Sequence, residues 1–408
     1  MNALDCAKKI VKQLNEAGYT AYFAGGWVRD FLMGHPSSDI DIATNAPPET
    51  IVKLFPKTVP VGISFGVVIV LMDGHQFEVS TFRRDLEYQD GRRPTEIELS
   101  TPVEDAQRRD FTINGMFYDP VEEKVIDYVK GQEDLKRGVV RTIGNPHERF
   151  VEDRLRMIRA VRFAERFGFT IDEETRKAIA ENAKTLFPAV AIERVWQELE
   201  KMAEYPNFAQ AIVELHQLGL LSVIFPVFKT IDVEELKRRV SSFANFPKES
   251  PPILYVMELF PDASLETQSE LCQYLKVSNK NSRLVEFTCR ARELVQKEES
   301  EDVEWARYYA QPNAQLSLEV IAARYPSDKR ATFLSKHKER QKRLDAHIQR
   351  IASRQPLVTS LDLQQEGIPP SKKMGELLEE AERISVNQDL HDKEQVLTVL
   401  KQSPKWPH

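Results

Sequence analysis

The hydrophobic pattern of this 408-residue chain changes type near residue 145. Before that point, helical patterns alternate with short runs such as "DIDIA" and "HQFEVSTF", which are typical of half-buried strands. After it, apolar residues recur at helical spacing through "AIERVWQELEKMA" and most later segments. We therefore predict an α/β head, with a small mixed sheet and helices, followed by an all-α remainder.

The chain is also longer than one hydrophobic core usually serves, so several domains are expected. Turn-rich stretches such as "FPVFKTID", "NFPKESPP" and "SRQPLVTS" interrupt the helical part. We place boundaries near residues 143, 200 and 300. The predicted parts are a head over 1–143, a neck over 144–200, a body over 201–300 and a tail over 301–408.

Composition excludes several classes of protein. Apolar residues make up 41% and charged residues 29%, and the chain lacks an apolar run of about eighteen residues that could span a bilayer. The start, "MNALDCAKKIVKQLNEAGY", lacks the apolar core of a signal peptide, so we expect a cytoplasmic protein without a membrane partner. Cys6, Cys272 and Cys289 are odd in number and widely spaced, which favours buried thiols over disulfides or a zinc site.

The net charge of −7 argues against indiscriminate binding to nucleic acid. The basic residues are nevertheless concentrated in "FRRDLEYQDGRRP", "AQRRDF" and "EDRLRMIRAVRFAERF". A local basic surface on an acidic chain is compatible with this distribution.

Two aspartates in "GHPSSDIDIAT" are the first candidate site residues. Side chains at i and i+2 of a strand share a face, so Asp39 and Asp41 should project together while Ile40 and Ile42 enter the core. Two neighbouring carboxylates repel each other unless a cation joins them, and Mg²⁺ prefers such pairs with phosphate oxygens and water. The alternative is a half-exposed strand whose solvent face is acidic.

A glycine-rich turn stands just upstream, in "FAGGWVRDFLMG". Gly25 and Gly26 should join a strand to a helix that carries Arg29, an arrangement that offers backbone N–H groups and a cation to phosphates. An ordinary strand-to-helix turn would have the same sequence. The turn and the aspartate pair together predict a phosphate cradle beside a metal site more specifically than either does alone.

At this point the sequence resembles a known family. "GGWVRDFLMGHPSSDIDIAT", "RRDFTINGM", "EDRLRMIRAVRF" and "ERVWQELEK" follow in the order of the motifs of the class II tRNA nucleotidyltransferases and bacterial poly(A) polymerases. That family belongs to the polymerase-β-like nucleotidyltransferases, and the resemblance covers about residues 20 to 215. It implies a catalytic head, a nucleotide-recognising neck and a tail that binds tRNA.

For the head, the resemblance implies that Asp39 and Asp41 hold two Mg²⁺ ions. One ion would activate the RNA 3′-hydroxyl, and the other would bind the triphosphate. Glu78, which points away from Phe77 and Val79 on a neighbouring strand, could supply a third carboxylate. An exposed strand residue is an equally good interpretation of Glu78.

The segment "EDAQRRDFTINGMFYD" contains a second set of candidates. By resemblance, Arg109 contacts the incoming nucleotide, Asp110 supports it and Asn114 has a supporting role. The alternative is a basic helix start in which Asp110 only pairs with an arginine. The order of the motifs favours the functional role more for Arg109 than for Asp110.

We expect "VEDRLRMIRAVRFAERFG" to be one amphipathic helix. Val151, Leu155 and Ile158 would form its apolar face. A second series steps by three, so that neighbouring members are within reach of one another; it comprises Asp153, Arg156, Arg159 and Arg162. A solvated charged face is the alternative.

The resemblance implies that Asp153 and Arg156 act as an amino-acid template. A carboxylate that accepts and a guanidinium that donates can satisfy the Watson–Crick edges of cytosine and adenine, whereas uracil and guanine would leave polar groups unpaired. Arg159 and Arg162 would reach the base or the triphosphate. A further set supports these residues by resemblance, mainly through salt bridges, and comprises Glu152, Glu193, Arg194 and Glu198.

Residues 83–95, with Tyr88, Asp90 and Gly91, resemble the family's flexible loop, which helps to change the preference from C to A. Enzymes that add only CC typically lack this loop. Residues 362–384 resemble, more loosely, the helical segment that grips the tRNA elbow in CCA-type enzymes. A loop followed by an ordinary amphipathic helix is the alternative there.

The resemblance therefore implies an enzyme that adds C, C and A from CTP and ATP to the 3′ end of tRNA, with Mg²⁺ and without a nucleic-acid template. It would recognise the acceptor arm by shape and end geometry, and DNA would not be a partner.

An A-adding enzyme and a poly(A) polymerase stay open as alternatives. A catalytically silent RNA-binding relative is disfavoured because both aspartates are present, and an enzyme with a small acceptor would leave the helical part without a task. The oligomeric state is not predicted.

Overall fold

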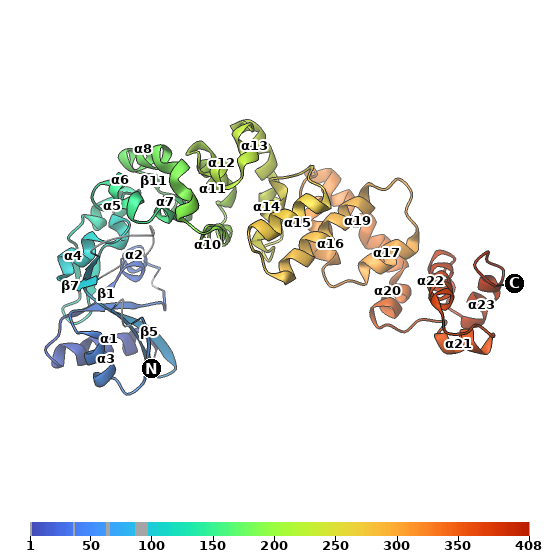
Figure 1. Cartoon of the computed structure of the whole chain (residues 1–408), viewed down its shortest axis with the longest axis horizontal. Helices are drawn as coiled ribbons and strands as arrows, with labels where there is room; N and C mark the ends of the chain where they lie inside the picture. The colour runs from blue at the N-terminus through green and yellow to red at the C-terminus, as the bar shows by residue number, and fades with distance from the viewer. Residues whose placement is uncertain (1, 36, 63–65, 86–96, 408) are drawn as a thin grey trace. The chain divides into compact units, whose positions relative to one another are not determined.

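The computed structural model describes residues 2–35, 37–62, 66–85 and 97–407. The chain forms two compact units, Met1–Lys237 and Arg238–His408 (Figure 1). Strands are concentrated in the first part of the first unit, and helices make up most of the remaining chain, which confirms the predicted fold class. The four predicted parts with boundaries near 143, 200 and 300 stay a prediction.

A mixed sheet of seven strands forms the centre of the head, in the order β3-β4-β5-β2-β1-β8-β9. Strands β2 and β5 are parallel, and the other neighbours are antiparallel. The strands are β1 (Ala21–Ala24), β2 (Asp41–Thr44), β3 (Thr58–Gly62), β4 (Val67–Met72), β5 (His75–Thr81), β8 (Phe117–Asp119) and β9 (Lys124–Ile126). Two small pairs lie apart from this sheet, β6 (Arg83–Asp85) with β7 (Ile97–Leu99) and β10 (Val139–Val140) with β11 (Thr170–Ile171).

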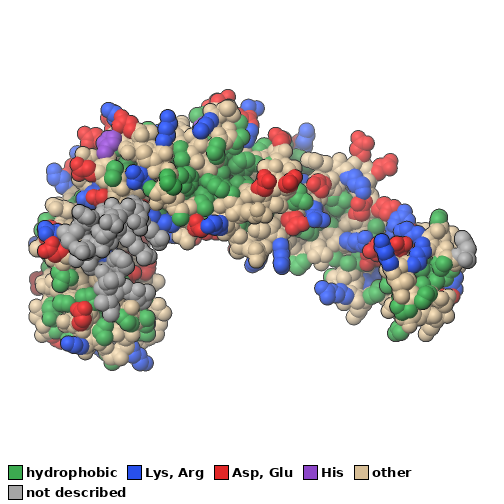
Figure 2. Space-filling view, viewed as in Figure 1, with side chains coloured by type: hydrophobic (Ala, Val, Ile, Leu, Met, Phe, Trp, Pro, Cys, Tyr) green, Lys and Arg blue, Asp and Glu red, His purple; other side chains and the backbone are tan. Residues whose placement is uncertain are grey.

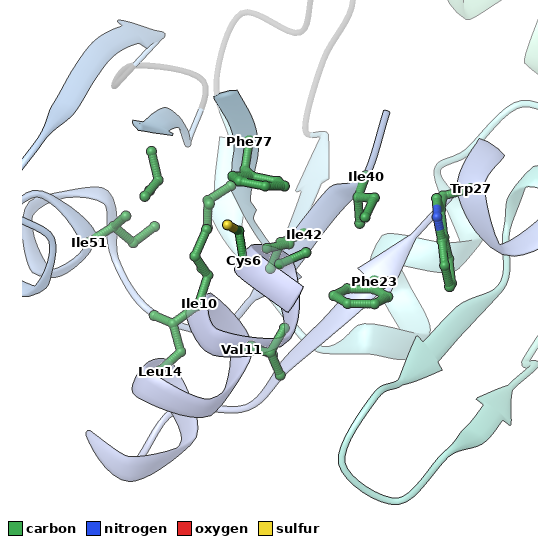
Figure 3. Packing of buried hydrophobic residues seen from close by; sticks show 14 of the residues in the cluster. Cys6, Ile10, Val11, Leu14, Phe23, Trp27, Ile40, Ile42, Ile51 and Phe77 are labelled. Atoms are coloured by element: carbon green, nitrogen blue, oxygen red, sulfur yellow. The ribbon is translucent and has the colours of Figure 1, made fainter. Parts of the chain in front are cut away.

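Helix α1 (Ala3–Glu16) covers one face of this sheet. Its apolar side chains pack against Phe23, Ile42 and Phe77, as Figure 3 shows. The apolar side of the helix is buried from Cys6 to Leu14, whereas Leu4 is 37% exposed at the start of the helix. Ile40 and Ile42 both enter this core, as predicted from the alternation in "DIDIA".

The other face of the sheet carries a second, smaller core with Ala43, Phe82 and Phe117. Because successive strand residues point to opposite faces, Asp41 lies on this second face, away from α1. Strand β2 begins only at Asp41, so Asp39 precedes the strand instead of lying within it as expected. The Asp39 backbone N–H instead donates to the Ser37 hydroxyl (3.2 Å).

A hairpin turn at Asp73 and Gly74 joins β4 to β5. Both residues have positive φ, 49° and 82°. This is the requirement of a two-residue type I′ turn, whose twist matches that of the flanking strands. The hairpin fixes the register of β5 and therefore the face to which Glu78 points.

The remaining elements of the first unit are helical. Those of the head are α2 (Gly26–Leu32), α3 (Pro48–Leu54), α4 (Pro102–Gln107), η2 (Thr112–Asn114) and α5 (Gly131–Arg137). The later ones are α6 (Pro146–Glu152), α7 (Leu155–Phe167), α8 (Glu173–Asn182), η3 (Ala183–Thr185), α9 (Leu186–Ala189), α10 (Ile192–Ala203), α11 (Phe208–Gln217), α12 (Leu220–Ile224), η4 (Pro226–Lys229) and α13 (Val233–Val240).

The single helix expected over "VEDRLRMIRAVRFAERFG" is wrong, because the chain breaks between α6 and α7. Asp153 has extended backbone angles (φ −146°, ψ 103°), and its side chain accepts from the Leu155 backbone N–H (3.1 Å). An aspartate that bonds to a nearby backbone N–H competes with a continuous helix. Val151 consequently lies outside the expected apolar face and is 56% exposed, whereas Leu155 and Ile158 are buried.

The second unit is built from helices alone among its described residues. They are η5 (Ser241–Asn245), α14 (Pro252–Glu258), α15 (Leu265–Tyr274), α16 (Asn279–Gln296), α17 (Asp302–Tyr309), α18 (Ala314–Ala322), α19 (Ser327–Arg343), α20 (Asp345–Ala352), α21 (Ser360–Gln365), α22 (Lys372–Asn387) and α23 (Lys393–Lys401). Two hydrophobic clusters hold the helices from α16 to α23 together. Helix α22 contributes Val386 to the first and Ile384 to the second, so it belongs to both cores.

Charged side chains of both signs are interspersed over the face of the molecule shown in Figure 2. Cys6, Cys272 and Cys289 are free and buried, as predicted. None of the helices in the described ranges is long and apolar enough to cross a membrane.

Gly131 at the start of α5 provides a test of the packing beneath η2. A Cβ at this position would meet the Thr112 backbone oxygen and lie 2.7 Å from Met116 Cγ, so the backbone would have to shift. We expect Gly131→Ala to lower the free energy of unfolding by about 1–3 kcal/mol. Gly375→Ala in α22, where the Cβ would meet open space, should instead stabilise by about 0.5–1 kcal/mol. Thermal unfolding of both variants measures the contrast, and equal effects would contradict it.

Candidate active site

Gly25 forms a tight turn between β1 and α2. Its backbone angles, φ 68° and ψ −129°, are readily available only to glycine. A Cβ there would lie 3.0 Å from Arg109 Nη1 and 4.0 Å from Asp41 Oδ2. The glycine therefore lets the backbone pass directly between a cation and a carboxylate that lie far apart in the sequence.

Three carboxylates, those of Asp39, Asp41 and Glu78, form an acidic edge beside this turn. Glu78 points away from the buried Phe77 and Val79, as predicted. Since Ile42 pairs with Val79 in the parallel β2–β5 ladder, Glu78 is the neighbour of Asp41 on the same face. Desolvation, together with the charges of Glu78 and Asp39, raises the pKa of Asp41 to about 6, against an opposing effect of Arg109.

The acidic edge suits a divalent cation by its chemistry. It offers hard oxygen donors, and burial together with the charges of Glu78 and Asp39 raises the pKa of Asp41, so a bound cation would favour its ionised form. Their oxygens are more widely spaced than the ligands of a bound metal would be. Among the described residues, a group of three possible ligands within 4.8 Å of one another occurs elsewhere, in the second unit.

A buried carboxylate fixes the two arginines of "RRD". Asp105, which is 1% exposed, accepts from Arg108 Nε (2.8 Å) and from Arg109 Nε and Nη2 (3.2 and 3.0 Å). Burial alone would raise the pKa of Asp105, but the two guanidiniums lower it. The carboxylate that contacts Arg109 is therefore that of Asp105, and not that of Asp110.

Asp105 was missed in the sequence although a signal for it exists. It stands three and four residues before the arginines on a helix, the spacing at which charged side chains meet. Helix α4 is fixed at its start by a capping box between Thr101 and Glu104. The cap sets where the helix begins and so which face carries Asp105.

Asp110 is the centre of a second network that joins the head to α7. It accepts from Asn114 Nδ2 (3.1 Å) and from Arg159 Nε and Nη2 (3.0 and 2.5 Å). Asn114 in turn accepts from Arg29 Nη1 (2.5 Å). Burial opposes ionisation of Asp110, yet Arg159 and Asn114 outweigh it and lower the pKa to about 2. Asp110 is thus an anion that orients Arg159.

Arg29 is almost fully buried, at 3% exposed. Its Nε donates to Asp30 (2.7 Å), and its guanidinium lies over the rings of Phe163 and Phe167, 5.3 and 4.6 Å from their centroids. These contacts disfavour the direct binding of a phosphate by Arg29 that the sequence predicted. Its contacts instead brace Asn114 and the aromatic face of α7.

Asp153 and Arg156 are each held by a partner outside the pair. Asp153 accepts from Arg194 Nη2 (3.0 Å), across from α10. Arg156 Nη1 donates to Glu152 (2.6 Å), and Nη2 donates to the Arg108 backbone oxygen (3.3 Å). Glu152 and Arg194 thus have the supporting contacts that the resemblance implied. Carboxylate and guanidinium are oriented by these partners without being paired to each other.

Arg162 and Glu198 form a buried ion pair between α7 and α10, with a distance of 2.6 Å from Nε to Oε2. Their side chains are 8% and 4% exposed. Arg162 also lies over Phe163, 4.2 Å from the ring centroid. Arg162 is committed to this pair and is outside the lining of the cleft, and Glu198 joins α10 to α7 through the same contact. Glu193 lies in the first turn of α10.

A cleft of about 440 Å³ connects these groups, a volume typical of small-ligand sites. Of the predicted site residues, its lining includes Gly25, Gly26, Arg29, Asp41, Arg109, Asp110, Asn114, Asp153, Arg156, Arg159 and Arg194. Arg108, Leu155 and Phe163 complete it and were not predicted. Asp39, Glu78, Glu152, Arg162, Glu193 and Glu198 are outside the lining. Most of the loop expected at 83–95 lies outside the described residues, between β6 and β7.

Three family models match the chain in sequence. A poly(A) polymerase head domain matches residues 21–141, and an RNA and SrmB-binding site of polymerase A matches residues 168–231. A tRNA nucleotidyltransferase domain 2 matches residues 254–400. Together they cover the head and most of the helical remainder.

Two relatives and one solved structure that match the chain are CCA-adding enzymes. The chain is 35% identical over 392 residues to a CCA-adding enzyme of Ligilactobacillus salivarius, covering 95% of this chain and 94% of that one. A CCA-adding enzyme of Geobacillus sp. is 45% identical over 212 residues, and there the matched part spans about half of that relative, 52%. The crystal structure of the Bacillus stearothermophilus CCA-adding enzyme in complex with CTP superposes with a TM-score of 0.73 at 29% identity, over 98% of each chain.

The acidic edge predicts an unusual dependence of stability on pH. The pKa of Asp41 is higher in the folded chain than in the unfolded one, so the folded chain binds more protons between about pH 4 and 6 and loses stability as the pH rises through that window. In EDTA, Asp41→Asn should therefore raise the melting temperature above about pH 6, and the gain should vanish below about pH 4. Glu122→Gln in the exposed β8–β9 turn is the control. A gain that is independent of pH would contradict the assignment.

Proposed function

The chain belongs to the family of CCA-adding enzymes and is a nucleotidyltransferase, and from this premise we propose that it adds C, C and A to the 3′ end of tRNA, with CTP and ATP as substrates. One observation carries the proposal. A single cleft has a carboxylate of the acidic edge on one side and an oriented carboxylate–guanidinium pair, Asp153 and Arg156, on the other. The first suits phosphoryl transfer and the second suits the choice of a base.

Asp39, Asp41 and Glu78 would hold the metal in this proposal. Bound Mg²⁺ ions, two in the family's mechanism, would activate the 3′-hydroxyl and neutralise the triphosphate. The chain's own contribution is to hold hard oxygen donors on adjacent strands of a rigid sheet. Burial and the charges of Glu78 and Asp39 disfavour the anionic form of Asp41, and a bound cation would offset these effects.

Arg109 is the best placed cation for the triphosphate. It lines the cleft beside Gly25 and Asp41, and Asp105 and the ring of Phe117, 5.2 Å away, fix its guanidinium. Arg159, oriented by Asp110, lies on the neck side of the same cleft. We assign Arg29 and Asn114 to positioning, because their polar groups are committed to the network behind Asp110.

Base selection would depend on Asp153 and Arg156. Cytosine and adenine each present an exocyclic amine next to a ring nitrogen, which match a carboxylate acceptor and a guanidinium donor. Arg194 and Glu152 restrain the two side chains, so a uracil could not be accommodated by simple rotation of either group. A mismatched base would leave a desolvated polar group unpaired, and that is a strong source of discrimination.

The finer points of the proposal depend on the resemblance. We assign tRNA binding to the tail, residues 301–408, and nucleotide recognition to the neck, residues 144–200. A chain that added only A, or a poly(A) polymerase, would use the same head and the same base-reading pair. The cytoplasmic location stays a prediction.

The products formed on defined acceptors test the activity and the metal assignment together. With tRNA transcripts that lack CCA, lack only the final A, or are complete, we expect the parent chain to complete the first two and leave the third unextended. Asp39→Ala should abolish incorporation of both CTP and ATP while tRNA binding persists, because the loss removes metal binding and not the RNA surface. Glu122→Ala is the matched control. Extension of complete tRNA would indicate a poly(A) polymerase. Addition only to the transcript that lacks the final A would indicate an A-adding enzyme. Normal incorporation by Asp39→Ala would refute the metal role.

Arg156→Ala tests the base-reading pair. Removing the guanidinium should lower the preference for CTP over UTP by about 10- to 100-fold in kcat/KM, because cytosine then loses a hydrogen bond that uracil does not form. Arg154→Ala, whose guanidinium contacts only the Val151 backbone oxygen among the contacts described, should leave the ratio unchanged. Melting temperatures of both variants separate loss of selectivity from loss of folding. An unaltered CTP/UTP ratio in folded Arg156→Ala would exclude the template role.

A further inference from the structure

Two histidines and an aspartate converge in the second unit, apart from the residues that line the cleft. Asp389 Oδ1 lies 2.9 Å from His347 Nε2 and 3.1 Å from His391 Nε2. The two imidazole rings are stacked, with centroids 4.6 Å apart. One ligand atom from each residue lies within 4.8 Å of the other two.

We propose that His347, Asp389 and His391 bind a divalent transition metal, with Zn²⁺ as the best match. Two imidazole nitrogens and one carboxylate oxygen are donors that suit Zn²⁺ and its neighbours in the first transition series, while Mg²⁺ and Ca²⁺ prefer oxygen alone. Bonds of about 2.0–2.2 Å in tetrahedral geometry place ligand atoms about 3.3 Å apart. The two measured separations are within a few tenths of an ångström of that value. Water would occupy the fourth position.

The backbone holds these ligands from two directions. His347 is fully buried in α20. Asp389 and His391 lie in the connection between α22 and α23, where Asp389 adopts a left-handed conformation, φ 52°. Aspartate tolerates this conformation better than most residues do. The turn therefore presents both of its side chains to the buried imidazole of α20.

Arg350 sets the cost of metal binding. Its Nη2 lies 2.6 Å from His347 Nδ1 and 2.8 Å from Ser385 Oγ. Since a guanidinium can only donate, Nδ1 is the acceptor and Nε2 carries the proton that is directed at Asp389. A metal at Nε2 must displace that proton, either to solvent or to Nδ1 once Arg350 turns away. Arg350 also lines a neighbouring cavity of about 360 Å³, which gives its side chain room to turn.

Bound metal would fasten α20 to the end of α22. Helix α22 shares its apolar residues between the two hydrophobic clusters of the second unit. A metal that binds the folded chain and not the unfolded one stabilises the folded chain by mass action. The site would thus add to the stability of the second unit, and it does not depend on the proposed nucleotidyltransferase activity.

Cobalt provides a direct spectroscopic probe. The full chain is freed of metal with EDTA, dialysed, and titrated with Co²⁺ in excess Mg²⁺, which occupies oxygen-only sites such as the acidic edge. We expect visible absorption typical of tetrahedral nitrogen and oxygen ligation, with one Co²⁺ per chain, and loss of the absorption on addition of one equivalent of Zn²⁺. Zn²⁺ should also raise the melting temperature.

Three variants identify the ligands and the role of Arg350. His391→Ala, at a half-exposed ring, should weaken Co²⁺ binding at least about tenfold. His147→Ala removes an exposed histidine of the first unit, which pairs with a single carboxylate, and should change nothing. Arg350→Met frees Nδ1 and should tighten binding by about tenfold.

The competing interpretation is a hydrogen-bonded His–Asp–His triad that never takes a metal. In that case the parent chain would show no saturable Co²⁺ absorption and no Zn²⁺-dependent change in melting temperature. Equal Co²⁺ binding by His391→Ala and the parent chain would also overturn the proposal, because the metal would then lie elsewhere. Neither result would bear on nucleotide addition, which is measured separately.

Discussion

The ion pair between Asp110 and Arg159 is the contact on which the geometry of the cleft depends. Asp110 comes directly after the arginines that α4 presents, and Arg159 lies on α7, so the pair sets the position of α7 relative to the sheet. Asn114 and Arg29 extend the same network to the glycine turn. A single chain of charged hydrogen bonds thereby couples the glycine turn to α7, and such networks are stronger than isolated pairs when every member is satisfied.

Buried charge in this unit is used to position groups more than to stabilise the fold. A buried ion pair such as Arg162–Glu198 gains little net stability over apolar packing, whereas loss of one partner costs about 3–5 kcal/mol. That asymmetry makes α7 and α10 intolerant of change at their contact. The same principle explains why Asp153 and Arg156 have partners that come from outside the pair. Arg194 orients Asp153, and Glu152 orients Arg156.

Sequence periodicity predicted well which face of an element is buried, but it predicted poorly which side chains contact one another. Alternation in "DIDIA" correctly placed Ile40 and Ile42 in the core, because a strand allows only two faces. The break at Asp153 was missed because its cause is a side chain that bonds to the backbone, which periodicity does not contain. Asp105 and Arg162 show the same limit. Spacing says which side chains can meet, but burial and the geometry of neighbouring helices decide which of them do.

The acidic edge indicates how far function opposes stability in this fold. Strand pairing forces Glu78 beside Asp41, and the charge of Asp39 adds to theirs, so the folded chain concentrates negative charge that the unfolded chain would disperse. A sheet selected for stability alone would carry neutral residues at one of these positions, as cross-strand like charges are unfavourable. The cost is tolerable because the sheet beneath has its own core against α1, independent of that edge. Rigid packing on one face of the sheet therefore permits electrostatic strain on the other, and the strained face is the one that opens onto the cleft.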